Sequence, residues 1–442
     1  MTLPGLAAAD EKMRAAGVSE AAREAFRTLY EQLTAGASGQ LPGDELEPVR
    51  DVRKLDDAAG DVPAEVVDRA VVIKLNGGLG TSMGLHGPKS LIEVKPGHTF
   101  LDLSVRQVLA LRRRHGARVP LVFMNSFSTQ RATLEALARH PDLEVDIPLD
   151  FLQNREPKLR ADDLHPVEWP ADPELEWCPP GHGDIYAALI GSGMLDTLLE
   201  KGYDIAFVSN VDNLGAILDP RILGWMVEER LPFVMEVVEG TEAERKGGHI
   251  ARHDGRLVLR ETAQVPDGDE SFTDYRRWLY YNTNTLWVDL RVLAERGVPK
   301  LPLIVNRKTA DPADPSTPEV LQLETAMGAA LSVIDGAQAI EVPRSRFAPV
   351  KTTNDLLVVR SDAYVLHEED ARLELSADRR QPTRPVVDLD PRFYKLLADF
   401  DARFPEGPPS MVHADRLVVR GDVTFGAGTV VSGEAEVRAP AT

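Results

Sequence analysis

The stretch AVVIKLNGGLGTSMGLHGPKS, residues 70–90, places a glycine-rich loop directly after a run of apolar residues. A short apolar run of this kind predicts a buried strand of an α/β sheet. Glycines remove side chains where a backbone turns sharply, so that its N–H groups can approach an oxyanion. Because open α/β sheets bind ligands at the carboxyl ends of their strands, the loop predicts a phosphate-binding site.

Two better-known phosphate loops do not fit this spacing. A P-loop needs glycine directly before its lysine, whereas Pro88 precedes Lys89. A dinucleotide-binding fingerprint needs glycine where Met83 stands. What remains is a glycine loop followed by Lys89, whose ammonium suits a phosphate as a point charge. The alternative is a structural turn with a surface lysine.

The rest of the chain extends this pattern. Apolar runs at 119–124, 205–208 and 233–238 alternate with longer helical patterns, which predicts an α/β fold. Ahead of the first strand, apolar residues at helical spacing predict a helix from Ser19 to about Leu33, with Ser19 as its N-cap.

The end of the chain has a different period. Read as hexads from Leu417, the segments LVVRGD, VTFGAG, TVVSGE and AEVRAP place apolar residues at equivalent positions, namely Val419, Phe425, Val431 and Val437. This pattern resembles the hexapeptide repeat of a β-helix. The alternative is a two-stranded hairpin that turns at residues 426–428. Ahead of the hexads, helical spacing predicts a connecting helix from Asp390 to Phe404.

Length and composition limit the class of protein. A chain of 442 residues with 43% hydrophobic residues predicts more than one domain. A net charge of -20 disfavours nucleic acid and anionic membranes as partners, and no apolar segment approaches the roughly 18 residues that span a bilayer. Cys178 is the only cysteine, so no internal disulfide can form. We therefore expect a cytoplasmic protein.

Further motifs follow the glycine loop in order. They are FMNSFST from Phe123, CPPGHGDIYAAL from Cys178, FVSNVDNLGA from Phe207, NTNTLWV from Asn282, LETAMGAAL from Leu323 and VPRSRFAPVKTTNDLL from Val342. Together with the loop they resemble the eukaryotic-type UTP–glucose-1-phosphate uridylyltransferases, also called UDP-glucose pyrophosphorylases. The resemblance runs from about residue 70 into the hexads. It implies an Mg²⁺-dependent reaction of UTP with glucose 1-phosphate that gives UDP-glucose and pyrophosphate.

The resemblance also implies an α/β architecture. We expect a Rossmann-like nucleotidyltransferase domain with a mixed central sheet, a small helical N-terminal part and a short C-terminal left-handed β-helix stub. The expected limits are 1–60 for the helical segment, 61–350 for the catalytic domain, 351–410 for a connecting segment and 411–442 for the stub.

Roles for single residues also come from the resemblance. It assigns Lys89 and Lys351 to catalysis at the reacting phosphates and Asp212 to Mg²⁺, which proteins usually hold with carboxylates and substrate phosphates. The expected nucleotide contacts are Leu75, Asn76, Gly77, Gly78, Gln153, Gly181 and His182. The amide of Gln153 offers the donor and acceptor that a uracil edge requires. The expected sugar contacts are Asn210, Gly248, Glu261, Asn282 and Asn284.

Other functions stay open at this point. A pyrophosphorylase of broader sugar specificity differs by modest pocket contacts, and a non-catalytic nucleotide-sugar sensor would keep the fold. An NAD-dependent dehydrogenase is disfavoured by Met83. Two features depart from the better-known eukaryotic members: His86 stands where they generally carry lysine, and the chain stops after about four hexads. Since those members use further β-helix coils to self-associate, we expect no large oligomer, although pairing at the end of the stub remains open.

Overall fold

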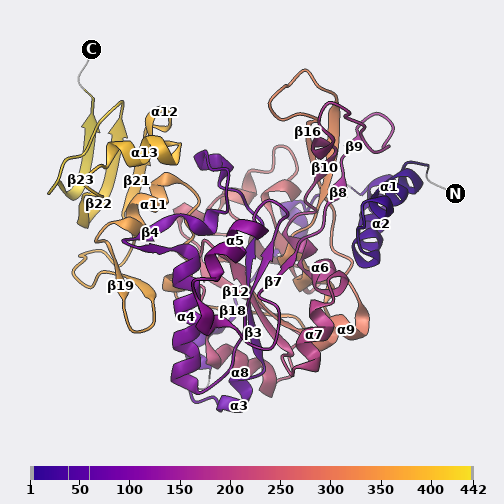
Figure 1. The fold of residues 1–442 in the computed structure, drawn as a ribbon, viewed down its shortest axis with the longest axis horizontal. Helices are drawn as coiled ribbons and strands as arrows, with labels where there is room; N and C mark the ends of the chain where they lie inside the picture. Colours follow the sequence, from indigo (N-terminus) through magenta and orange to yellow (C-terminus); the bar gives the residue numbers. More distant parts are fainter. Residues whose placement is uncertain (1–3, 38, 59, 440–442) are drawn as a thin grey trace.

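The structure is a computed structural model that describes residues 4–37, 39–58 and 60–439 (Figure 1). Its centre is a mixed sheet, to which the described residues contribute eleven strands. The main path runs in the order β2 (Arg53–Lys54), β18 (Gln338–Glu341), β12 (Phe233–Glu239), β15 (Tyr280–Asp289), β11 (Ile205–Asn210), β3 (Ala70–Asn76), β6 (Leu121–Asn125) and β7 (Asp150–Leu152). The predicted strands at 70–73, 119–124, 205–208 and 233–238 are thus confirmed as β3, β6, β11 and β12.

The sheet is buried on both faces. Along β3, Ala70 and Val72 belong to one apolar core, whereas Val71 and Ile73 belong to another. Successive side chains of a strand point to opposite faces, which explains why the apolar run is continuous. Helices α4 (Phe100–His115) and α8 (Pro220–Glu228) contribute to the first core, and α6 (Ile185–Gly191), α7 (Met194–Glu200) and α9 (Leu290–Arg296) contribute to the second.

Strand β15 makes the sheet mixed. It runs antiparallel to both neighbours, β11 and β12, while the β11–β3, β3–β6 and β6–β7 pairs are parallel. Its pairing with β12 shifts register after Glu236, so that Thr283 and Asn284 have no partner residue on that strand. Such a bulge bends the strand and redirects its side chains.

The N-terminal helices pack on a separate small sheet. Helix α2 (Glu20–Thr34) confirms the predicted helix, and the Ser19 hydroxyl accepts the N–H of Ala22 at 3.2 Å as its cap. Sequence analysis missed the preceding helix, α1 (Pro4–Ala15). Both helices cover a three-stranded sheet formed by β16 (Ile304–Thr309), β17 (Glu319–Glu324) and β9 (Leu159–Arg160), which joins apolar residues from distant parts of the chain in one cluster.

The C-terminal strands lie at the opposite end of the molecule from α1 and α2 (Figure 1). Strands β21 (Val386–Leu389), β22 (Ser410–Arg420) and β23 (Val430–Arg438) form a parallel sheet. Because β22 and β23 are parallel, the alternative of a hairpin between them is wrong. Val419, Phe425 and Val431 are buried, as the hexad pattern predicts.

The segment before this sheet is helical but interrupted. In place of one helix from Asp390 to Phe404, the chain forms α12 (Pro391–Tyr394) and α13 (Leu397–Arg403). Leu396 has an extended backbone at the N-cap of α13 and leaves 45% of its surface exposed. In the described part of the chain, no helix combines the length and the apolar character needed to cross a membrane.

A buried ion pair ties the sheet to the segment that precedes α11 (Thr353–Arg360). Glu236 of β12 is fully buried and accepts two hydrogen bonds from the Arg346 guanidinium, at 2.8 and 2.6 Å, and one from the Trp287 indole at 2.9 Å. A bidentate pair of this kind fixes the orientation of both partners.

We predict that Arg346→Met lowers the free energy of unfolding by about 3–5 kcal/mol, because it leaves Glu236 buried without a cation. Urea-induced unfolding measures this loss. The matched control is Arg27→Met, which removes an exposed ion pair with Glu24 and is expected to move the midpoint far less. Equal midpoints for the two variants would contradict the prediction.

Candidate active site

A cavity of about 320 Å³ opens at the carboxyl ends of β3, β6 and β11. It gathers most of the residues that were predicted to contact nucleotide, phosphate or metal. Its lining consists of Leu75, Gly77, Gly78, Lys89, Met124, Gln153, Pro179, Gly181, His182, Asn210, Val211 and Asp212. Strands that end at one edge of a parallel sheet bring these segments together although they lie far apart in the sequence.

The glycine loop folds back on itself. Leu79 forms a β-bridge with Pro88, and the Lys89 N–H donates to the Gly78 carbonyl at 3.3 Å. The two ends of the loop therefore lie side by side. As a result the Lys89 ammonium enters the cavity and forms an ion pair with one oxygen of Asp212. The other oxygen, Oδ1, is buried and has no hydrogen-bond partner.

One wall of the cavity carries Gln153. Its backbone N–H donates to the Asn125 carbonyl at 2.8 Å, which attaches it to the end of β6. A Cβ added to Gly77 would lie 2.2 Å from Gln153 Oε1, so the glycine leaves room for this amide. The position of Gln153 therefore depends on a bare backbone at Gly77.

A second wall of the cavity carries Gly181 and His182. Gly181 has a left-handed backbone with φ +78°, and a Cβ there would lie 2.6 Å from the Thr325 carbonyl oxygen. The His182 Nδ1 accepts the N–H of Met327 at 3.0 Å, which leaves the proton of the neutral ring on Nε2. Burial lowers the pKa of His182 to about 4. The imidazole is thus a neutral hydrogen-bond donor at pH 7.

Asn76 does not line this cavity. Its amide is buried and donates to Asn125 Oδ1 at 2.8 Å and to Thr133 Oγ1 at 2.9 Å. These bonds join the ends of β3 and β6 behind the glycine loop. The side chain therefore supports the loop from within the fold.

The predicted sugar contacts form a second group, apart from Asn210, which lines the cavity. The Asn282 N–H donates to the Gly248 carbonyl at 2.9 Å, and the Asn282 amide donates to Asn284 Oδ1 at 2.8 Å. Glu261 hydrogen-bonds Asn282, and burial raises the pKa of its carboxyl. A Cβ at Gly248 would lie 2.5 Å from Glu261 Oε2, so this glycine also leaves room for its neighbour.

The bulge in β15 explains how the two asparagines meet. Asn284 has a left-handed backbone with φ 53°, and its N–H donates to Asn282 Oδ1 at 2.8 Å. In a regular strand, residues two apart point to the same face but do not bond each other's backbone. No local pattern in the sequence indicates this bulge, because it depends on the antiparallel placement of β15.

Lys351, one of the two predicted catalytic lysines, lies outside the cavity lining. Its side chain is exposed, and its backbone N–H donates to Asp355 Oδ2 at 3.0 Å at the start of α11. The preceding residue, Val350, donates its N–H to the Asp212 carbonyl at 3.2 Å. The Lys351 charge also acts on the Glu261 carboxyl and opposes the rise of its pKa. Lys351 does not line the cavity, but its backbone lies next to Asp212 and its charge reaches Glu261.

Sequence analysis missed a buried lysine beneath this edge of the sheet. Lys74 of β3 donates to Ser209 Oγ at 2.8 Å and to the Ala216 carbonyl at 2.9 Å. Burial lowers its pKa to about 7. These two bonds fix the turn that contains Asp212. A lysine inside an apolar strand was the available signal.

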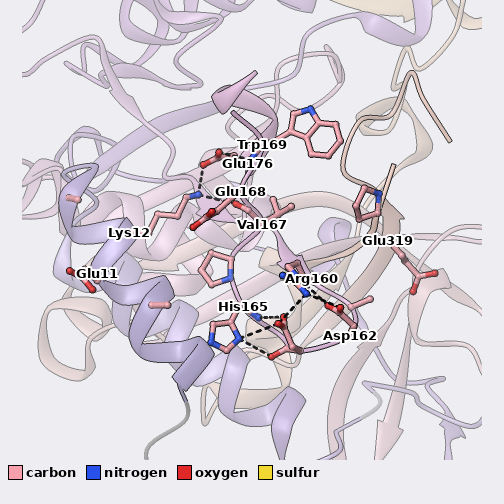
Figure 2. A pocket seen from close by; sticks show the side chains of 16 residues that line it. Glu11, Lys12, Arg160, Asp162, His165, Val167, Glu168, Trp169, Glu176 and Glu319 are labelled. Atoms are coloured by element: carbon pink, nitrogen blue, oxygen red, sulfur yellow. Dashed lines mark hydrogen bonds and ion pairs between the residues drawn. The ribbon is translucent and has the colours of Figure 1, made fainter. Parts of the chain in front are cut away.

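A larger cavity, about 1180 Å³, lies elsewhere, between α1 and residues 160–169 (Figure 2). In it Lys12 pairs with Glu176, and Arg160 pairs with Asp162. It contains none of the predicted site residues, and several of its ionic groups pair with one another. Size therefore does not identify the functional site.

Comparison with known proteins shows the family of the chain. The sequence profile of the family described as UTP–glucose-1-phosphate uridylyltransferase matches residues 23–432. The chain belongs to the UTP–glucose-1-phosphate uridylyltransferase family. The resemblance of the ordered motifs is thereby confirmed.

Relatives in this uridylyltransferase family match nearly the whole chain. The protein of that name from Solanum tuberosum is 43% identical over 408 residues, which cover 90% of this chain and 83% of the relative. The Hordeum vulgare protein is 40% identical and covers 96% and 90%. A UDP-glucose pyrophosphorylase structure from Leishmania major matches with a TM-score of 0.94 at 44% identity and covers 99% and 95%. A mutant of that enzyme in complex with UDP-glucose matches with a TM-score of 0.93 at 44% identity and covers 98% and 94%.

We predict that Gly181→Ala lowers the free energy of unfolding by at least about 1–2 kcal/mol, because alanine is strained in a left-handed backbone and would also strike Thr325. Gly87→Ala is the control, since Gly87 lacks a left-handed φ and has open space around it. Thermal unfolding of both variants measures the difference. A Gly181→Ala protein as stable as the control would refute this reading of the turn.

Proposed function

We propose that this protein transfers the uridylyl group of UTP to glucose 1-phosphate and gives UDP-glucose and pyrophosphate in a reversible reaction. One observation carries the proposal: the glycine loop, Lys89, Asp212, Gln153 and the Gly181 turn line a single cavity. The neighbouring Asn282 group, where the Lys351 charge acts on Glu261, adds a polar site of the kind that binds a hexose.

The chemistry needs little from a side chain as nucleophile or base. Glucose 1-phosphate carries an anionic oxygen that can attack the α-phosphorus of UTP in line with the departing pyrophosphate. The main obstacle is repulsion between two anions. Lys89, Lys351 and the backbone N–H groups of the glycine loop would neutralise the phosphates and hold attacking and leaving oxygens in line. Catalysis would then rest on positioning and electrostatics.

Asp212 fits a role in holding Mg²⁺. Its Oδ1 is buried without a partner, and no cluster of three or more His, Cys, Asp and Glu side chains suited to a metal occurs among the described residues. Mg²⁺ typically takes one or two carboxylates together with substrate phosphates and water. When bound, it supplies positive charge to the phosphate oxygens.

For the base, Gln153 and the backbone of Gly181 offer donors and acceptors from two sides. A neutral His182 donates a hydrogen bond from Nε2 without adding charge. For the sugar, Asn282, Asn284 and Glu261 suit hydroxyl groups. Broader acceptance of sugar 1-phosphates is the nearest alternative, and a non-catalytic nucleotide-sugar-binding protein is a second.

We further propose that the C-terminal parallel sheet is a β-helix stub. Its three parallel strands and the buried hexad positions Val419, Phe425 and Val431 support this. The predicted domain limits stay a prediction, and two strands cross them: β2 of the predicted N-terminal segment pairs in the central sheet, and β21 of the predicted connecting segment pairs with β22. A cytoplasmic location is consistent with the single, buried cysteine, Cys178.

A substrate matrix tests the proposed uridylyltransferase activity. In a matrix of nucleotides and sugar 1-phosphates, UTP with glucose 1-phosphate and Mg²⁺ should release pyrophosphate fastest, and EDTA should abolish release. Comparable rates with galactose 1-phosphate would favour the broader enzyme. Binding of UDP-glucose without pyrophosphate release from any pair would favour the binding protein, and no response to uridine nucleotides would refute the proposal.

A mutation of Lys351 tests the proposed role of its charge in catalysis. We predict that Lys351→Ala lowers kcat by about 10²–10³ while the Kd for UTP changes little, because its charge counts most as charge develops in the transition state. Lys201→Ala serves as a control, since Lys201 pairs with Asp146 before β11 begins, away from the cavity. Steady-state kinetics with calorimetric binding separate the two quantities. A near-normal kcat with a raised KM would exclude this role for Lys351.

A further inference from the structure

Asp184 connects the two walls of the nucleotide cavity. It follows Gly181 and His182 by a few residues and closes the short helical turn His182–Asp184. Its Oδ2 accepts the backbone N–H of Asn154 at 2.6 Å, and its Oδ1 accepts the Asn154 side-chain amide at 2.8 Å. Asn154 directly follows Gln153, so one carboxylate spans from the turn of Gly181 to the segment of Gln153.

Close to the cavity the two segments are also joined by a short strand pair, since Glu156–Pro157 pairs with Trp177–Cys178 and the Cys178 Sγ donates to the Glu156 carbonyl at 3.6 Å. Beyond that pair, each wall is attached to a different part of the fold. Gln153 bonds Asn125 at the end of β6. On the other side, the Thr325 N–H donates to the Pro180 carbonyl at 3.0 Å, and the Gly183 N–H donates to the Thr325 carbonyl at 2.9 Å. Within the described chain, the hydrogen bonds reported between residues 153–155 and 179–185 are the two that Asp184 accepts.

We propose that Asp184 is a positioning residue that sets the separation of Gln153 from the Gly181–His182 turn, and thereby the affinity for the uracil base. This inference rests on the proposed function, because it takes uridine nucleotide as the ligand of the cavity. Asp184 itself does not line the cavity. It acts through Asn154 and the turn.

The chemistry of a carboxylate is essential to this role. Asn154 presents two donors, and only a group with two acceptor oxygens can satisfy both. An amide at position 184 would keep one acceptor and turn an NH₂ toward the other donor. A protonated carboxyl has the same defect, because one oxygen then carries a hydrogen.

Protonation of Asp184 falls in an accessible pH range. Burial raises its pKa to about 6, against the opposing effect of the two Asn154 hydrogen bonds. The charged and titratable groups nearby are Glu156 on β8 (Glu156–Pro157), Glu324 on β17, Cys178 on β10 (Trp177–Cys178), His182 on its own turn, and Arg155, Glu24 and Lys300 around the adjoining apolar cavity. Above pH 6 the carboxylate accepts both bonds, and below pH 6 one is lost. Affinity for uridine ligands should therefore fall as the pH is lowered through 6.

The test uses UDP-glucose, whose diphosphate diester is fully ionised and therefore keeps the same charge from about pH 5 to 8. Calorimetry should give a wild-type Kd that rises as the pH is lowered through about 6. At pH 7.5, Asp184→Asn should raise the Kd about tenfold, the usual effect of losing a hydrogen bond to a charged group. Its Kd should also lose the pH dependence centred near 6. In turnover, KM for UTP should rise, kcat should change little, and preference for UTP over CTP should weaken.

The matched control is Glu156→Gln. Glu156 is another buried acid close to Asp184, and its Oε1 has no hydrogen-bond partner. This variant should keep the wild-type Kd, pH profile and base preference. If Asp184→Asn fails to fold, Asn154→Ala tests the inference in its place. This variant removes the hydrogen bond from the Asn154 amide to Asp184, and it should weaken UDP-glucose binding severalfold.

Asp184→Asn with wild-type affinity, pH profile and base preference would overturn this inference and leave the proposed function standing. The same holds if Asp184→Asn does not fold and Asn154→Ala binds UDP-glucose like the wild type. Failure of the wild type to bind UDP-glucose at any pH would instead overturn the proposed function, and the inference with it.

Discussion

The buried pair between Glu236 and Arg346 holds the site together. Arg346 begins the segment that returns to the sheet edge: its carbonyl accepts the Asn213 amide at 3.1 Å, and the Ala348 N–H donates to Asn213 Oδ1 at 3.0 Å. The neighbouring Val350 bonds the Asp212 backbone. Because Glu236 is fixed in the central strand β12, the whole segment has one position relative to the sheet. The backbones of Asp212 and Lys351, which lie far apart in the sequence, therefore have fixed positions relative to each other.

Charge is distributed unevenly over this acidic chain. The net charge of -20 repels anions at long range, so a site for phosphates needs cations at short range. Lys89 lines the cavity, Lys351 lies near the Asn282 group, where its charge acts on Glu261, and Lys74 lies beneath the sheet edge with a pKa that burial lowers to about 7. Lys74 is held by neutral oxygens and lies near no carboxylate that bonds it directly. Glu236 and Asp212 nevertheless act on it electrostatically, and with a pKa of about 7 it is only partly charged near neutral pH, so its contribution to the field of the site is partial.

Local patterns in the sequence predicted those parts of the structure that local physics determines. The apolar runs predicted the strands, Ser19 predicted a cap, and the glycine loop was correctly placed at a strand end. Other features depend on contacts between distant residues. The bulge at Asn284 needs β15 to lie antiparallel between two strands, and the inward orientation of Asn76 needs Thr133. The sequence alone does not distinguish Asp184 from other acidic residues in turns, because its role depends on the contact with Asn154 that the fold creates.

The ion pair between Lys89 and Asp212 has a consequence for how the ligand-free site discriminates. Each charge already has a partner, so a simple anion gains little by entering, since it must first displace a carboxylate. The displaced carboxylate then needs a cation of its own. Uptake of a phosphate and uptake of a cation are therefore linked: each raises the affinity for the other by the same factor. If Asp212 holds Mg²⁺ as we propose, the site would favour phosphate ligands that bind together with their cation.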